Sequence, residues 1–216
     1  MNRLPIAERG ITIGDFLVPV RISERLSTRA RHVVLTVTGA LFIYLTAQIV
    51  IPLPDNPVPI TGQTLGVLLV GGALGFRRGF LATFLYVAVG IIGFPAFAEH
   101  KAGLGVIASF DQGHLVLGAR GGYLIGFMVA SAIVGRLAEL GWDRHLPGAA
   151  AAMILGNLAI YAVGLPWLAV ATGFSVSQTI EKGLIPFVLG DTLKLILAGA
   201  LFPFAWWIVG RRPSES

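Results

Sequence analysis

Long apolar stretches recur along almost the whole 216-residue chain and constrain its fold more than any other feature. A membrane-spanning helix needs about 20 predominantly apolar residues, and a helix satisfies its own backbone hydrogen bonds in lipid. Only 12% of the residues are charged, whereas soluble domains carry about 25%. We therefore predict an all-α integral membrane protein, a bundle of six spanning helices at about 33–53, 63–76, 79–98, 121–141, 148–172 and 183–208. The stretch at 63–76 is short for a crossing, so five or seven helices stay open as alternatives.

Lysine and arginine residues indicate how the chain is oriented, because cytoplasmic loops carry an excess of them. With the N-terminus inside, twelve of the sixteen lie on the cytoplasmic side, three lie outside and Lys194 lies within a span. We therefore predict that both termini are cytoplasmic. The expected organisation is a basic cytoplasmic tail over 1–32, a six-helix membrane domain over 33–210 and a short cytoplasmic tail over 211–216.

The same distribution explains the net charge of +5 by topology, so no nucleic-acid partner is expected. Residues 1–30 mix Arg with Asp and Glu and lack the continuous apolar core of a secretory signal. They are interpreted as a tail or an interfacial helix. The expected location is the inner membrane of a bacterium, as a multi-pass protein.

Enzymatic chemistry finds little support in the sequence. The chain contains no phosphate-binding loop, no HExxH motif and no GxSxG elbow, and its four histidines are scattered over predicted loops. It has no cysteine. We therefore expect no enzyme, no catalytic residue, no metal site and no cofactor in this chain.

Asp191 and Lys194 stand out because they place opposite charges inside the last apolar stretch, GDTLKLILAGALF at 190–202. Three residues apart, they share one face of a helix. A charge at the bilayer centre costs roughly 2.5–3.5 kcal/mol on insertion scales, and such residues usually mark a ligand or ion pathway. The pair is therefore interpreted as a polar ligand site. A buried ion pair that fixes helix register is the alternative.

Other polar residues near the predicted outer surface are candidates for the same site. Arg120, at the start of the fourth span, can bind a carboxylate through a bidentate fork, or it is an ordinary interfacial arginine. Loop 52–62 holds four prolines, and its stiffness would place Thr61 and Gln63 at the mouth of the second span. Asn157 on the fifth span is a lesser candidate, with a helix-packing hydrogen bond as the alternative. Loop 99–120 is either a lid over an outward-facing pocket or a plain connection.

Small residues recur at four-residue spacing on three of the predicted spans, at Gly71 and Gly75, at Gly122 and Gly126, and at Gly148, Ala152 and Gly156. This spacing allows helix backbones to approach closely in lipid. It predicts packing within this bundle, with docking of a partner helix as the alternative.

Three stretches together resemble the BioY family, the biotin-specific substrate-capture (S) components of energy-coupling factor (ECF) transporters. They are the segment at 51–98 that contains VPITGQT and the Tyr86–Gly90–Gly93–Pro95 pattern, GGYLIGF at 121–127, and GDTLKLILAGAL at 190–201. The resemblance covers about residues 35–205. It implies a six-helix membrane bundle with a biotin pocket near the outer surface. It also implies, as partners, a transmembrane coupling (T) subunit and two ABC-type ATPase subunits, which would use the ATP.

Carried over by position, the DxxK pair of the family falls on Asp191 and Lys194. Biotin has ureido N–H groups that need an acceptor, such as Asp191, and a ureido oxygen and a carboxylate that need donors, such as Lys194 and Arg120. Its rings and aliphatic tail need an apolar wall, for which Tyr86, Phe97 and Tyr161 are candidates. Which donor binds which end stays open.

The sequence departs from the family pattern over 99–120, which is longer and more polar here and has Ala119–Arg120 where members commonly have Pro–Thr. The leading hypothesis is high-affinity biotin binding and uptake driven by ATP hydrolysis on other chains. A stand-alone secondary transporter of biotin or a related small carboxylate, with Asp191 as a proton relay, is the alternative. A non-transporting membrane scaffold is a third reading.

Overall fold

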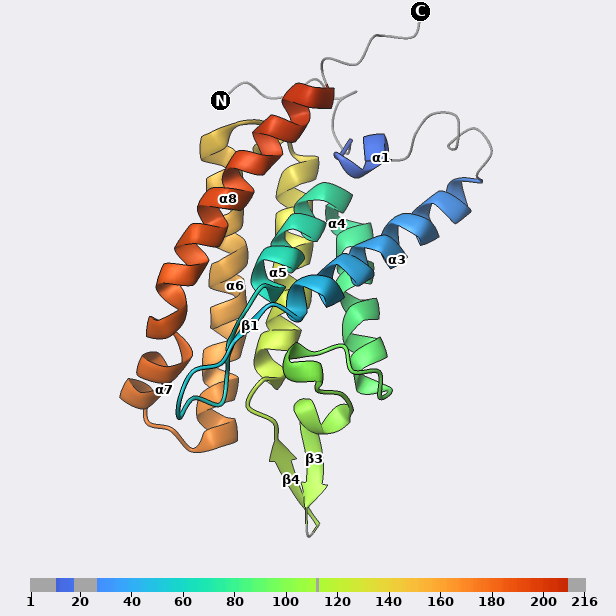
Figure 1. Ribbon diagram of the computed structural model, residues 1–216. Coiled ribbons are helices and arrows are strands. Elements are labelled where there is room, and N and C mark those ends of the chain that lie inside the picture. The colour runs from blue at the N-terminus through green and yellow to red at the C-terminus, as the bar shows by residue number, and fades with distance from the viewer. Residues whose placement is uncertain (1–10, 18–26, 112, 210–216) are drawn as a thin grey trace, which may run out of the picture.

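Five helices are long and apolar enough to cross a membrane in the computed structural model, which describes residues 11–17, 27–111 and 113–209. They run side by side in one elongated bundle, with α3 crossing it obliquely (Figure 1). The five are α3 (Thr28–Ala47), α4 (Gln63–Ile91), α5 (Gly121–Glu139), α6 (Leu146–Thr172) and α8 (Ile185–Val209). The chain is thus mostly helical, as the apolar stretches predict.

The second and third predicted spans are the two arms of α4, and the chain reverses between them at Gly75. This glycine has φ 81° and ψ 179°, outside the helical region. A Cβ placed on Gly79 would lie 2.9 Å from the Cα of Gly71, which is possible only if the arms fold back on each other. The backbone N–H of Phe76, which opens the second arm, donates to Glu139 Oε1 of α5 at 2.9 Å. Figure 1 shows the two arms as antiparallel neighbours.

Helix ends differ from the expected spans mainly at the end of the bundle that carries the two hairpins. The first expected span continued to residue 53, but α3 ends at Ala47, and the third continued to 98, but the helix ends at Ile91. Prolines follow both ends within a few residues and cannot continue a helix. The predicted cytoplasmic tails lie mostly outside the described residues. Within 1–32, the structure describes the short helix α1 (Gly14–Leu17) and the first turn of α3.

Two small antiparallel sheets, which the all-α expectation did not include, accompany the helices. The proline-rich loop is the connection of a hairpin between β1 (Val50–Ile51) and β2 (Ile60–Thr61). Loop 99–120 contains the hairpin β3 (Ala108–Asp111) to β4 (His114–Leu117), which projects from the end of the bundle (Figure 1). The remaining elements are α7 (Val176–Gly183) and the 3₁₀ turns η2 (Ala98–His100), η3 (Leu104–Val106) and η4 (Trp142–Arg144).

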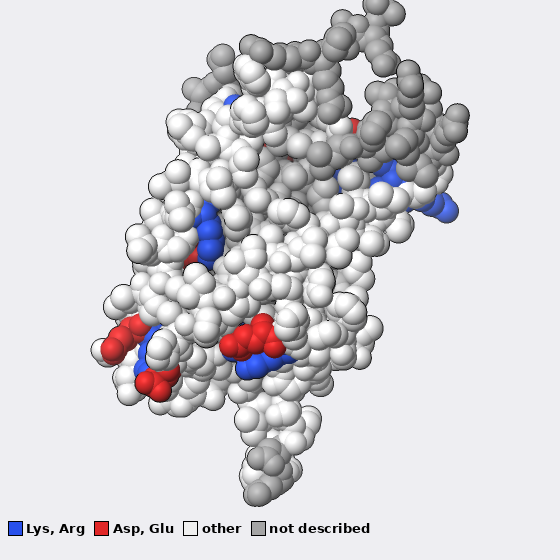
Figure 2. Space-filling model, viewed as in Figure 1, with Lys and Arg blue, Asp and Glu red and all other residues white. Residues whose placement is uncertain are grey.

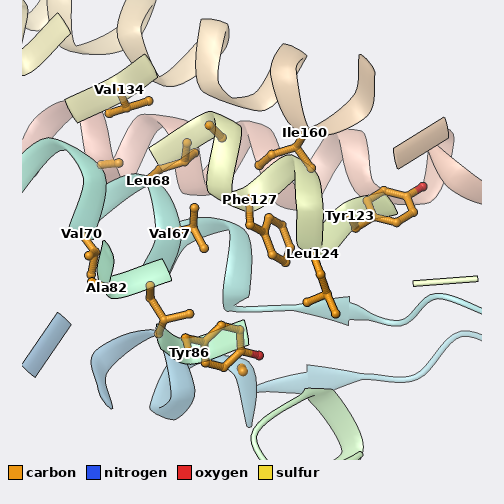
Figure 3. Packing of buried hydrophobic residues seen from close by; sticks show 14 of the residues in the cluster. Val67, Leu68, Val70, Ala82, Tyr86, Tyr123, Leu124, Phe127, Val134 and Ile160 are labelled. Carbon is orange, nitrogen blue, oxygen red and sulfur yellow. The ribbon is translucent and has the colours of Figure 1, made fainter. Parts of the chain in front are cut away.

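The core lies between α4, α5 and α6, whose buried side chains pack against one another (Figure 3). Small residues allow this packing: a Cβ on Gly71 would lie 2.7 Å from the carbonyl oxygen of Ser131, and one on Gly126 would lie 2.9 Å from that of Ile160. These two glycines therefore bring helices of this chain together, as the small-residue spacing predicts.

Large apolar side chains are exposed along the outside of α3, α4, α6 and α8. On the face shown in Figure 2, the surface between the two ends carries few charged residues, apart from one basic patch edged by acidic atoms. A protein with such a surface is suited to lipid, since apolar patches of this extent are rare on soluble monomers.

Candidate functional site

A cavity opens at the end of the bundle that carries the two hairpins. Its empty volume, which includes the open mouth, is about 600 Å³. Hairpin β1–β2, the segment before η2, and helices α5, α6 and α8 surround it. Its lining is Val58, Pro59, Thr61, Gln63, Thr64, Phe97, Ala98, Val106, Arg120, Tyr123, Leu124, Phe127, Ile160, Tyr161, Phe187, Asp191 and Lys194.

Asp191 and Lys194 form an ion pair in the wall of this cavity. Lys194 Nζ lies 3.0 Å from Asp191 Oδ1, and the side chains are 15% and 7% exposed. The other carboxylate oxygen, Oδ2, accepts hydrogen bonds from the Tyr161 hydroxyl and from Asn157 Nδ2, the latter at 3.3 Å. Such bonds offset part of the cost of burying a charged pair. The ion pair predicted as the alternative therefore exists, but it faces a cavity.

Asn157 itself lies behind Asp191, outside the cavity lining. Its Oδ1 atom is buried and has no hydrogen-bond partner among the described residues. Its contribution is to hold Asp191 in place from α6, since the amide donates to the carboxylate.

Thr61 and Gln63 lie at the start of the first arm of α4, where the stiffness of the proline-rich loop was predicted to place them. The Thr61 hydroxyl accepts from the backbone N–H of Gln63 at 3.2 Å and stabilises the start of the helix. Gln63 Nε2 donates to the hydroxyl of Tyr86, which in turn donates to the carbonyl of Ala96 at 3.2 Å. The Gln63 amide is therefore oriented by Tyr86 behind the cavity wall and by Thr61, whose hydroxyl donates to its Oε1 at 3.4 Å.

Tyr86 was expected to form part of the apolar wall, and the structure corrects this. The side chain is 2% exposed and lies behind Gln63, outside the lining. Its ring packs edge-on against Phe97, with centroids 5.8 Å apart. Tyr86 therefore positions Gln63 and Phe97, which do line the cavity.

Arg120 holds together the loops at the mouth. Its Nε donates to the carbonyl of Pro57 at 3.1 Å, and Nη1 to that of Ala98 at 3.4 Å. Nη2 donates to Glu99 Oε2 at 2.7 Å. The side chain is only 15% exposed. The arginine predicted for a ligand carboxylate thus already binds a carboxylate of this chain.

The apolar wall includes Phe97 and Tyr161, as expected, and several residues that the sequence reasoning missed. Tyr123 packs edge-on against Tyr161 with centroids 6.5 Å apart, and its hydroxyl donates to the carbonyl of Gly183 at 2.9 Å. Helix spacing could have identified the others: Phe187 lies four residues before Asp191, and Phe127 four residues after Tyr123.

The arrangement can bind a small molecule that combines an apolar body with polar ends. An acidic and a basic side chain meet on one wall, a guanidinium lies at the mouth, and aromatic rings lie between them. Among the described residues, no group of three or more His, Cys, Asp or Glu side chains could hold a metal ion.

Comparisons with known proteins agree on one family. The sequence profile of the BioY family matches residues 21–211. A probable biotin transporter BioY of Pyrococcus horikoshii is 36% identical over 74% of this chain and 88% of its own length. The biotin transporter BioY of Rhodobacter capsulatus is 35% identical over 82% of this chain and 91% of its own length.

One solved structure has a similar fold. It is the crystal structure of the S-component for biotin from an ECF-type ABC transporter, with a TM-score of 0.73 at 23% sequence identity. The alignment covers 84% of this chain and 95% of that one.

Proposed function

Because the chain belongs to the BioY family, whose sequence profile matches residues 21–211, we propose that the cavity of this chain captures biotin for uptake. In this proposal the chain is the substrate-capture component of an ECF-type ABC transporter and not an enzyme. The names of the relatives and the function of the solved neighbour support it.

The observation that carries the proposal is the pairing of Asp191 and Lys194 on the wall of a cavity that aromatic and aliphatic side chains also line. The ureido N–H groups of biotin would donate to Asp191, and its ureido oxygen would accept from Lys194. The rings and the aliphatic tail would lie against Phe97, Tyr161 and Tyr123, all of which line the cavity. The carboxylate at the end of the tail would bind Arg120 at the mouth.

Transport would require other chains. The proposed partners are a transmembrane coupling (T) subunit and two ABC-type ATPase subunits, which hydrolyse ATP, while this chain needs no cofactor. A stand-alone secondary transporter, with Asp191 relaying a proton, is a second candidate. The buried carboxylate bonded to the Tyr161 hydroxyl favours it. The Lys194 ion pair disfavours it, because the carboxylate is already paired with a cation of this chain.

The proposed topology has six crossings, with both arms of α4 in the membrane and both termini in the bacterial cytoplasm. The reversal at Gly75 supports the six crossings. The end of α8 lies at the same end of the bundle as α1, opposite the cavity (Figure 1). The excess of Lys and Arg on that side supports the orientation.

Tracer uptake into proteoliposomes tests this function. Vesicles would contain the chain alone or together with the T subunit and the ATPases, with ATP supplied to the nucleotide-binding side. We expect radiolabelled biotin to enter only with all subunits and ATP, and Asp191→Asn to abolish uptake. Uptake by the chain alone that an uncoupler abolishes would instead establish the secondary transporter. No biotin uptake with any composition would refute both candidates.

A further inference from the structure

The guanidinium at the mouth of the cavity is occupied by a carboxylate of the chain itself. Glu99 Oε2 lies 2.7 Å from Arg120 Nη2 and 3.3 Å from Lys101 Nζ. One oxygen atom therefore bridges two cations. The hydrogen bond from Arg120 holds the pKa of Glu99 below its ordinary value, so the carboxylate is charged at neutral pH.

This ion pair lies between the cavity and the exterior. Arg120 lines the cavity and also a second hollow, with an empty volume of about 630 Å³, which Pro57, Lys101 and Gly118 help to line. The Glu99 side chain is 36% exposed, whereas that of Arg120 is 15% exposed. The carboxylate can therefore move into solvent while the guanidinium stays in place.

The backbone that carries Glu99 is held in a disfavoured conformation. Glu99 has φ 61° and ψ 30°, and His100 has φ 55°. Residues with a Cβ rarely occupy this left-handed region, and two in succession need support from their surroundings. The support comes from the ion pairs and from the Phe97 N–H, which donates to the carbonyl of Lys101 at 3.0 Å. The ion pair with Arg120 is thus one of the contacts that hold Glu99 in this conformation.

We propose that Glu99 is a resident carboxylate that competes with the ligand's carboxylate for Arg120. Binding of a carboxylate ligand is then an exchange of one anion for another, and return of Glu99 to Arg120 assists release. Glu99 thereby weakens binding of the free acid and leaves binding of a neutral analogue unaffected. This inference rests on the proposed capture of biotin by the cavity.

The test compares biotin with biotinamide, which keeps the rings and the tail but replaces the carboxylate by a neutral amide. Both are titrated into the purified full chain as wild type, Glu99→Gln and Glu181→Gln. The control removes an exposed acidic residue of α7, at the same end of the bundle, whereas the hydrogen bonds found for the Arg120 side chain go to Pro57, Ala98 and Glu99. A partly exposed ion pair is worth up to about a fivefold change in affinity.

We expect Glu99→Gln to bind biotin about two- to fivefold more tightly and to release it more slowly, with biotinamide unchanged. Glu99→Ala is expected to act in the same direction, which provides a second variant if the first is not recovered folded. Glu181→Gln is expected to leave the affinity for both ligands unchanged. In an Arg120→Gln background, Glu99→Gln should have no further effect on biotin, because the competition no longer exists.

Unchanged or weaker biotin binding by both Glu99 variants would overturn the inference. An equal change for biotin and biotinamide would also overturn it, since that would indicate a structural role of Glu99. In either case, the proposed function would still hold if the wild type binds biotin and Asp191→Asn abolishes that binding. Absence of wild-type biotin binding would refute the proposed function itself.

Discussion

Replacing Gly75 by alanine tests whether α4 is one long helix or two arms joined by a reversal. The glycine has φ 81° and ψ 179°, and a Cβ there would lie 2.9 Å from Glu139 Oε1 and 3.0 Å from Thr12 Cγ2. A residue with a side chain in this part of φ/ψ space costs about 1–3 kcal/mol, and the close contact with Glu139 adds to it. We expect Gly75→Ala to lower the free energy of unfolding by about 2–3 kcal/mol.

The sign of the change in stability distinguishes a continuous helix from two arms joined by a reversal. In a continuous helix, alanine would stabilise the chain by about 1 kcal/mol relative to glycine. For a domain of this size, each kcal/mol shifts the melting temperature by about 2–4 °C, so the expected fall is roughly 4–12 °C. The assay is thermal unfolding of the purified protein in detergent, followed by circular dichroism. Gly105→Ala is the control, because a Cβ there meets only the Ser109 Cβ at 4.0 Å.

An unchanged or raised melting temperature for Gly75→Ala would refute the reversal. It would mean that α4 continues as one helix, and the proposal of six crossings would lose its main support. A fall in Gly75→Ala of the expected size, with Gly105→Ala unchanged or slightly stabilised, would support the antiparallel arms.

Two further predictions concern buried polar groups. Burial of Asp143, whose Oδ2 accepts from Trp206 Nε1 at 2.7 Å, raises the pKa of this carboxyl to about 6 from an ordinary value of 3.8. Since the folded state then binds the proton more tightly than the unfolded state, stability should fall by on the order of 2–3 kcal/mol between about pH 4 and pH 6. In Asp143→Asn, unfolding at a series of pH values should lack this slope; an unaltered slope would contradict the assignment. For Tyr161→Phe, we expect a loss of about 1.5–3 kcal/mol of stability, because the hydroxyl bonds to the charged Asp191. Tyr123→Phe should lose only about 1 kcal/mol, since its acceptor is the neutral carbonyl of Gly183; equal losses in the two variants would argue against a charged Asp191.

Long apolar stretches predicted the helical bundle well, because lipid demands a helix wherever the chain crosses it. The hairpins were not predicted. The pairing of Val50 with Thr61 and of Phe110 with Leu115 depends on turns and on contacts between segments. The ends of α3 and α4 near the hairpins were also placed too late, because Pro52 and Pro95 stop a helix within stretches that are still apolar.

The candidate site was predicted in part. Charges inside an apolar stretch are rare enough to single out Asp191 and Lys194 as candidate site residues from the sequence alone. The partner of Arg120 could not be identified, because Glu99 lies 21 residues away and is brought to it by the fold of two loops. Tyr86 was assigned to the wall by its place in a motif, but which side of a helix faces the cavity depends on how the helices pack.

The most direct test of the account is a calorimetric titration of the detergent-purified chain with biotin, alongside Asp191→Asn and Asp143→Asn. The second variant is the control, because Asp143 is also a buried aspartate but lies outside the cavity lining. We predict one biotin per chain, at least tenfold weaker binding in Asp191→Asn and unchanged affinity in Asp143→Asn. Absence of binding to well-folded protein, or equal affinity in Asp191→Asn and wild type, would contradict the claim that this cavity captures biotin.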